Sequence, residues 1–152
     1  METPLVTPSR SPVRSDGDAN QPVPATPRTR VLCVDDSADM SEMLALFIRR
    51  QPDMEDAGVL GSAEGIVDEV IRCRAAVVVL DLTMPGPSPL EAIRELRNQV
   101  PSCRVIAFSG YDDQDTRESA QRAGAWELVS KHGDLSDILK AIRRVVDQEA
   151  RA

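Results

Sequence analysis

Short apolar runs recur along most of the chain and predict β-strands. The runs at 31–34, 76–80 and 105–108 are continuously apolar, as expected for parallel strands that are covered on both faces. Two weaker candidates lie at 54–60, which we assign to an edge of the sheet, and at 128–129. The hydrophobic pattern therefore predicts five strands.

The segments between these runs have the periodicity of amphipathic helices. The first helix is capped by Ser37 and ends before Pro52, because the residue that precedes a proline disfavours helical geometry. Its apolar positions are Met40, Met43, Leu44, Phe47 and Ile48. A second helix covers 66–71, and a third begins at Ser88 with Pro89 in its first turn.

The last two predicted helices differ in character. Residues 112–123 form a polar helix that Gly124 closes. The final helix opens at Asp134 and is expected to bury Leu135, Ile138, Leu139, Ile142 and either Val145 or Val146. Strands that alternate with helices form parallel sheets with right-handed crossovers. We therefore expect an α/β fold, a doubly wound (βα)5 arrangement in which a five-stranded parallel sheet carries helices on both faces.

Residues 1–28 differ in composition from the rest of the chain. They hold six of the eleven prolines, mixed with Ser, Thr, Asp and Arg. Such a segment buries too little apolar surface to offset the entropy lost on ordering. We expect a disordered, Pro-rich leader at 1–28, followed by one domain at 29–150. Four Ser/Thr-Pro dipeptides in the leader are candidate kinase or docking sites, although a solvated leader without a specific role is the preferred interpretation.

Charge and hydropathy exclude several functional classes. A net charge of −7 and a pI of about 4.7 disfavour direct nucleic-acid binding, which relies on Lys and Arg. The longest apolar run, 75–80, has six residues, whereas about 20 are needed to span a bilayer. The N-terminus also lacks the apolar stretch of a secretory signal. We therefore expect a cytoplasmic protein that does not contact membranes.

The three cysteines do not indicate a disulfide framework or a zinc site. Cys33, Cys73 and Cys103 are odd in number, and no two of them form a CxxC pair. We expect small, buried, reduced thiols.

Polar residues follow four of the five predicted strands. Asp35 and Asp36 come after the first strand, Asp81 after the third, Ser109 after the fourth and Lys131 after the fifth. The carboxyl ends of parallel strands lie at one edge of the sheet, where open α/β folds bind ligands. We therefore expect these five side chains to converge there.

This set of side chains favours phosphoryl transfer at a magnesium site. Crowded carboxylates repel each other unless a cation joins them, and oxygen ligands without clustered His or Cys suit Mg²⁺. A carboxylate is a competent nucleophile toward phosphorus, while Lys131 and Ser109 supply a positive charge and a hydroxyl donor for a phosphoryl group. Taken singly, each residue has an ordinary explanation as a helix cap, a solvated strand end or a surface lysine. A site is favoured because all of them follow strands and are expected at the same edge of the sheet.

The order and spacing of these residues resemble the CheY-like receiver domains of response regulators. The motifs that carry the resemblance are VLCVDDS at 31–37, VLDLTMPG at 79–86, IAFSG at 106–110, AGA at 123–125 and Lys131. The resemblance covers residues 30–149 and implies the strand order 2-1-3-4-5. The stretches around Phe108 and after Lys131 look most similar to receivers of the NarL/LuxR-type subgroup.

The resemblance also implies roles for individual residues. Asp81 would accept a phosphoryl group from a sensor histidine kinase, a phosphotransfer protein or a small phosphodonor, and Ser109 and Lys131 would contact that group. Mg²⁺ would be held by Asp36, Asp81 and the backbone carbonyl of Thr83, with Asp35 in a supporting role.

The output of such a domain is expected to be a switched interaction with another protein. The chain ends at Ala152 without a helix-turn-helix domain, so we expect a stand-alone receiver with a downstream protein partner, and a phosphorylation-dependent homodimer is left open. The resemblance places the binding surface on the fourth helix, fifth strand and fifth helix. Trp126 is a candidate partner contact, although partial burial of an aromatic side chain is the preferred interpretation.

Three departures from the family pattern accompany the resemblance. Leu128 stands where an aromatic residue is usual, His132 where proline is common, and 87–89 replaces a glycine-bearing loop. We interpret His132 as a loop residue. A degenerate receiver that acts as a constitutive scaffold is therefore the alternative hypothesis. A Mg²⁺-dependent hydrolase ranks last, because we expect no general acid near the acidic cluster and no cap domain.

Overall fold

The computed structural model describes residues 27–151, and side chains as far as residue 148. The predicted leader at 1–28 therefore lies outside the described residues except for Pro27 and Arg28. In the described part of the chain, no helix combines the length and apolar character that crossing a membrane requires.

Five parallel strands form one sheet in the order β2-β1-β3-β4-β5, which confirms the predicted topology. The strands are β1 (Thr29–Val34), β2 (Met54–Leu60), β3 (Val77–Asp81), β4 (Arg104–Ser109) and β5 (Glu127–Ser130). β1, β3 and β4 are the inner strands of the sheet, where neighbours on both sides and helices on both faces explain their continuous apolar runs.

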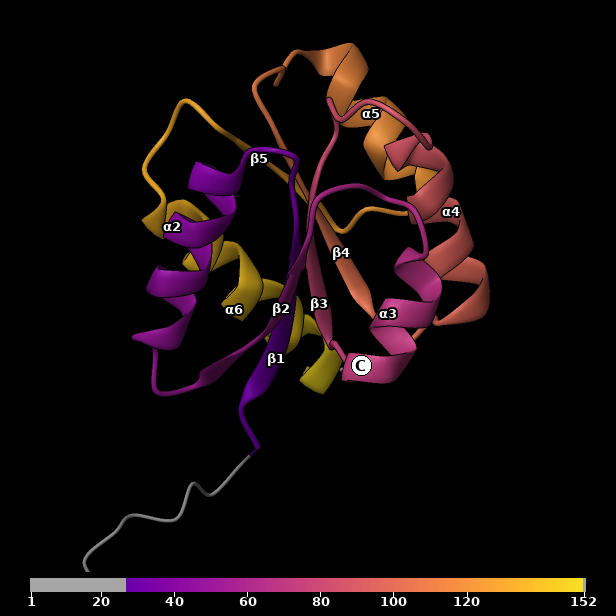
Figure 1. Cartoon of the computed structure of the whole chain (residues 1–152). Coiled ribbons are helices and arrows are strands. Elements are labelled where there is room, and N and C mark those ends of the chain that lie inside the picture. Colours follow the sequence, from indigo (N-terminus) through magenta and orange to yellow (C-terminus); the bar gives the residue numbers. More distant parts are fainter. Residues whose placement is uncertain (1–26, 152) are drawn as a thin grey trace, which may run out of the picture.

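Five helices cover the sheet. They are α2 (Ala38–Arg49), α3 (Ile66–Cys73), α4 (Pro89–Gln99), α5 (Gln114–Ala123) and α6 (Ser136–Arg151). Figure 1 shows α2 and α6 on one face and α3, α4 and α5 on the other. The doubly wound arrangement expected from the sequence is confirmed.

Each face of the sheet has its own hydrophobic core because side chains alternate along a strand. In β1, Val31 and Cys33 belong to the core under α2 and α6, whereas Leu32 and Val34 belong to the core under the other three helices. The two cores pack the strands against helices on both faces and so define where the strand ends lie.

Helix caps lie largely where the sequence predicts them. The hydroxyl of Ser37 accepts a hydrogen bond from the Met40 N–H, and that of Ser88 accepts one from the Glu91 N–H. The polar helix begins two residues later than predicted, at Gln114, because Asp113 is its N-cap. Hydrogen bonds from Thr116 hold the pKa of the Asp113 carboxyl below its usual value.

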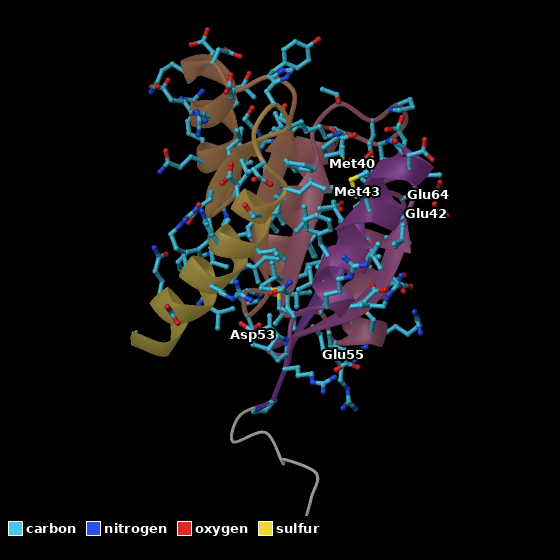
Figure 2. The ribbon with its side chains drawn as sticks, turned by 90° about the vertical axis from the view of Figure 1, so that its left-hand side faces the viewer. Met40, Glu42, Met43, Asp53, Glu55 and Glu64 are labelled. Carbon is cyan, nitrogen blue, oxygen red and sulfur yellow. The ribbon has the colours of Figure 1, made fainter. Side chains whose placement is uncertain are left out.

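The buried face of α2 differs from the predicted one. Met43 is 47% exposed, and the buried residues are Ser41, Leu44, Ala45 and Ile48. The buried residues lie on one face of α2 at helical spacing, and Met43 lies outside that face. Figure 2 shows Met43 near Met40 at the upper end of α2. Ile71 in α3 is likewise exposed rather than part of the core.

β2 is the edge strand that the sequence predicts, and it is irregular. Its register against β1 shifts between Val31 and Leu32, and Gly58 has a φ of 132°, a conformation that favours glycine. The Asp56 carboxylate accepts a hydrogen bond from the Gly58 N–H and pairs with Arg49 of α2 at 2.9 Å. This irregularity explains the weak strand pattern in the sequence.

Two arginines fasten α6 to the rest of the domain. Arg143 donates two hydrogen bonds to the carboxylate of Asp53, at 2.9 and 3.0 Å, and Arg144 contacts Glu127 of β5 in the same bidentate way. Asp53 lies at the lower end of the sheet in Figure 2, away from the carboxyl ends of the strands. The Arg143 contact holds the pKa of the Asp53 carboxyl below its usual value.

Candidate functional site

Three carboxylates gather where β1 and β3 end. Asp81 is the last residue of β3, and Asp35 and Asp36 follow β1, its neighbour in the sheet. One carboxylate oxygen from each residue lies within 4.8 Å of the others. Asp35 and Asp81 are only 3% and 2% exposed, whereas Asp36 is exposed to solvent. The predicted convergence of the acidic residues is therefore observed.

Asp35 is held by hydrogen bonds from the start of α2 and to the last residue of β2. Its Oδ1 accepts the Ser37 N–H at 2.9 Å, and its backbone carbonyl accepts the Ser41 hydroxyl at 3.3 Å. Its own N–H donates to the carbonyl of Leu60. These contacts orient the side chain, so that Oδ2 faces the site.

Asp81 is oriented by the loop that follows it. Its Oδ1 accepts two hydrogen bonds from Thr83, from the N–H at 3.0 Å and from the hydroxyl at 2.9 Å. The sequence predicts a role for the carbonyl of Thr83 only, so the hydroxyl contact is an addition. A threonine two residues after a strand-terminal aspartate is the signal for it, because Ser and Thr side chains readily bond to an acceptor two residues away.

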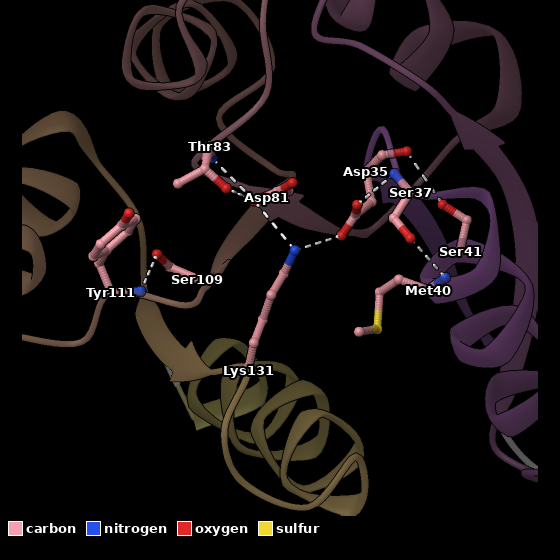
Figure 3. Close-up of polar contacts among 9 residues, drawn as sticks. All are labelled: Asp35, Ser37, Met40, Ser41, Asp81, Thr83, Ser109, Tyr111 and Lys131. Carbon is pink, nitrogen blue, oxygen red and sulfur yellow. Dashed lines mark hydrogen bonds and ion pairs between the residues drawn. The ribbon is translucent and has the colours of Figure 1, made fainter.

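Lys131 crosses the site from the opposite side (Figure 3). Its Nζ lies 3.0 Å from Asp35 Oδ2 and 3.4 Å from Asp81 Oδ1, and the ammonium is also 5.4 Å from the centre of the Phe108 ring. The Lys131 N–H donates to the Ser109 carbonyl at 2.8 Å, which continues the pairing of β4 with β5 and anchors the lysine backbone. The side chain therefore offsets the negative charge of two buried carboxylates.

Ser109 is fully buried at the end of β4. Its hydroxyl accepts the Tyr111 N–H at 2.9 Å, and Figure 3 shows it on the side of Tyr111. Ser109 and Thr83 line the same cleft of about 300 Å³, between the loops after β3 and β4. The serine is thus beside the acidic site, with its hydroxyl engaged by its own loop.

The donor set fits a hard divalent cation. The three clustered residues offer only carboxylate oxygens, the ligands that Mg²⁺ prefers, and ligands on opposite sides of an octahedral Mg²⁺ lie about 4 Å apart. The present separation of up to 4.8 Å needs only small side-chain movements to match. Because Asp36 is exposed, a cation could reach the cluster from solvent through this residue.

The remaining residues singled out in the sequence lie around this site or at the far end of the sheet. Leu128 is partly buried and lines a cleft of about 310 Å³ between α5 and β5. Trp126 precedes β5, at the opposite end of that strand from Lys131, and is 39% exposed, with the guanidinium of Arg104 stacked 4.1 Å from its ring centre. The indole thus belongs to the exposed hydrophobic side chains and is covered on one side by Arg104, and the partner contact stays a prediction.

Sequence reasoning missed Ser41, whose hydroxyl supports the Asp35 backbone. Ser41 shares the buried face of α2 with Leu44, Ala45 and Ile48, at helical spacing. A small polar residue at a buried position is the signal that points to it, because buried hydroxyls require a hydrogen-bond partner.

None of the three cysteines is in a disulfide, and all three are buried, as expected. Burial, together with the negative charges of Asp56 and Asp35, raises the pKa of the Cys33 thiol to about 12. Cys33 is therefore a protonated core residue.

Comparison with known proteins assigns the chain to a family. Residues 31–143 match the response regulator receiver domain. The chemotaxis protein CheY of Thermotoga maritima is 30% identical over 116 residues, which cover 76% of this chain and 96% of that protein. The transcriptional activator protein ExaE of Pseudomonas putida is 32% identical over 116 residues, 76% of this chain and 54% of that protein. A protein-glutamate methylesterase/protein-glutamine glutaminase of T. maritima is 31% identical over 133 residues, 80% of this chain but 38% of that protein.

Solved structures agree with this assignment. The response regulator domain of T. maritima CheB has a TM-score of 0.71 and 29% identity, with 77% of this chain and 95% of that one covered. A LuxR-family response regulator from Aurantimonas has a TM-score of 0.75 and 26% identity, with 80% and 86% covered. With the strand order, the acidic cluster and the lysine in place, the chain belongs to the family of response regulator receiver domains, the signalling domains of two-component systems.

Proposed function

We propose that this domain is a phosphorylation switch in which Asp81 accepts the phosphoryl group in a Mg²⁺-dependent reaction. One observation carries the proposal: the Lys131 ammonium lies against both Asp35 and Asp81, where three carboxylates meet. An ammonium group at this point neutralises the buried carboxylates and also lies where it can contact a phosphoryl group on Asp81.

Asp81 is the best placed nucleophile of the three. It is buried, and its Oδ1 is engaged by Thr83, so Oδ2 is the oxygen that attacks phosphorus. In the proposed step a bond forms between this oxygen and phosphorus, while the bond from phosphorus to the donor breaks. The electron pair leaves with the donor, which is the imidazole of a phosphohistidine or the carboxylate of an acyl phosphate.

The other side chains stabilise charge on the phosphoryl group. Lys131 is within reach of the group once it is attached to Asp81, and Ser109 can turn its hydroxyl toward it by leaving the Tyr111 N–H. When bound by Asp36, Asp81 and the carbonyl of Thr83, with Asp35 in support, Mg²⁺ supplies neutralisation of the negative charge that gathers on the phosphoryl oxygens.

The proposed readout is a change of the surface formed by α5, β5 and α6. Ser109 ends β4 and pairs with Ser130 of β5, so a shift of Ser109 toward Asp81 alters the loop that leads into α5. A downstream protein, or a second copy of this chain, would bind that surface. The protein that supplies phosphate would be a sensor histidine kinase or a phosphotransfer protein.

The chain spans 38% and 54% of the length of the methylesterase and the activator that it resembles. Their activities therefore do not transfer to it, and we propose a signalling domain without enzymatic turnover of its own. A cytoplasmic location and the lack of direct nucleic-acid binding are also part of this proposal, on the basis of the acidic composition.

The direct test is phosphorylation by acetyl phosphate. The protein is incubated with acetyl phosphate and Mg²⁺, and intact mass is followed together with that of Asp81→Asn and of a matched control, Asp36→Asn. We expect one phosphoryl group per chain, stable in acid and labile in base, absent from D81N and slow to form in D36N. A modification that persists in D81N would contradict the assignment of the acceptor. Repeated hydrolysis of phosphate esters would indicate a hydrolase instead.

A constitutive scaffold is the second candidate, and Leu128 is the observation that favours it. The position that commonly carries a mobile aromatic residue holds an aliphatic side chain packed against the core. Partner binding that is equal for the wild type and D81N, with and without acetyl phosphate, would support the scaffold.

A further inference from the structure

Two loops at the carboxyl edge of the sheet are joined by a pair of neighbouring hydrogen bonds. The β4–α5 loop follows Ser109, and the β5–α6 loop contains Lys131. The Lys131 N–H donates to the Ser109 carbonyl at 2.8 Å, and one residue farther along, His132 Nε2 lies 2.9 Å from the Gly110 carbonyl. A carbonyl can only accept, so Nε2 of His132 carries the proton in this contact.

The backbone of His132 is fixed by a tight turn. Its N–H donates to the Ser130 hydroxyl at 3.1 Å, and the Gly133 N–H donates to the Ser130 carbonyl at 3.4 Å. A Cβ on Gly133 would lie 2.7 Å from Oδ2 of Asp137, so the turn packs closely against the start of α6. The imidazole therefore extends from a defined point toward the neighbouring loop.

Gly110 is the residue through which Ser109 is oriented. It lies between Ser109 and Tyr111, whose N–H holds the Ser109 hydroxyl at 2.9 Å. The far end of the same loop is tied to α5, because Arg117 Nε donates to the Asp112 carbonyl at 2.9 Å. The Gly110 carbonyl and the Tyr111 N–H belong to one peptide unit, so the His132 contact acts on the group that holds the Ser109 hydroxyl.

We propose that His132 is a positioning residue that holds the β4–α5 loop in its resting conformation. The contact ties Gly110 to the residue next to Lys131 and so keeps the Ser109 hydroxyl on the Tyr111 N–H, away from Asp81. When the Ser109 hydroxyl turns toward a phosphoryl group, it leaves the Tyr111 N–H, which belongs to the peptide unit that His132 holds in place. This inference rests on the proposed function. It assigns to the His132 imidazole the role of stabilising the unphosphorylated conformation.

The test compares two substitutions of similar size. His132→Gln keeps a donor, since its Nε2 is the same number of bonds from Cα as the imidazole Nε2, and His132→Leu removes it. Binding of beryllofluoride, a noncovalent mimic of the phosphoryl group, is measured by calorimetry at saturating Mg²⁺. We expect H132L to bind it about two- to fivefold more tightly than the wild type, which is the effect of losing one exposed hydrogen bond from the resting state, and H132Q to match the wild type. Mg²⁺ affinity should be the same in all three proteins.

A second readout uses the fact that His132 is the one histidine in the chain. Its imidazole proton resonances should move when beryllofluoride joins Mg²⁺, and not with Mg²⁺ alone. Unchanged or weaker binding by H132L, or H132Q that behaves like H132L, would overturn the role of His132 while leaving the switch itself intact. If the wild type binds no beryllofluoride at all, both the switch and the role of His132 are wrong.

Discussion

Lys131 and Asp35 are separated by 96 positions in the chain and meet at 3.0 Å in the fold. The Lys131 ammonium contacts two of the three carboxylates that can bind Mg²⁺. Lys131 and a bound Mg²⁺ would therefore be neighbouring positive charges on the same carboxylates. The lysine therefore opposes metal binding electrostatically while favouring a phosphoryl group.

Substitution of Lys131 should separate these two effects. We expect Lys131→Met to bind Mg²⁺ several-fold more tightly, because one positive charge is removed from beside the carboxylates, and to lose at least about tenfold in phosphorylation rate by acetyl phosphate. Calorimetric titration with MgCl₂ and intact mass over time are the measurements. Weaker Mg²⁺ binding by K131M would show that the lysine organises the carboxylates rather than competing for them.

The two adjacent aspartates should respond oppositely to loss of their charge. Asp36 is exposed, so Asp36→Asn should leave stability unchanged or raise it by about 0.5 kcal/mol, and should weaken Mg²⁺ binding at least about tenfold. Asp35 is buried and bonded to Ser37 and Lys131, so Asp35→Asn should lower the free energy of unfolding by about 2 kcal/mol. Urea unfolding with and without Mg²⁺ checks both; equal destabilisation by the two substitutions would contradict the difference in burial.

The contact between Arg143 and Asp53 should stabilise the fold only at pH values where Asp53 is ionised. The folded pKa of Asp53 lies below its usual 3.8, so the contribution is present above that value and is lost as the pH falls through the lower folded pKa. Asp53→Asn should therefore cost about 0.5–1 kcal/mol from pH 5 to 8, because the pair is half exposed, and this difference should shrink below pH 4. Urea unfolding of both proteins across this range is the measurement. A difference that grows in acid would contradict the assigned direction.

The cysteines should be unreactive in the native protein. Burial raises the pKa of the Cys33 thiol to about 12, and Cys73 and Cys103 are also buried, so none of the three sulfur atoms is accessible to a reagent in solution. We expect iodoacetamide to modify none of the three thiols within the time in which it modifies all of them in guanidinium chloride. Mass spectrometry of the intact chain counts the adducts. Rapid native labelling of one cysteine would locate a segment that opens.

Much of the fold follows from local patterns in the chain. The buried strands at 31–34 and 76–80 are recognisable because central parallel strands are apolar on both faces, and the caps at Ser37 and Ser88 because their hydroxyls bond to backbone groups three residues away. The rule that parallel strands end at one edge then brings Asp35, Asp36 and Asp81 together before any coordinates are known.

Tertiary packing decided the side-chain contacts between segments that are far apart in the chain. The sequence by itself determined which elements form and which side chains reach the edge of the sheet. Only the fold decided that Lys131 joins Asp35 to Asp81, that the Ser109 hydroxyl bonds to its own loop, and that Met43 turns outward on α2. The physical reason is that periodicity and capping are properties of neighbouring residues, whereas side-chain contacts across the sheet depend on how the helices pack and which rotamers that packing leaves open.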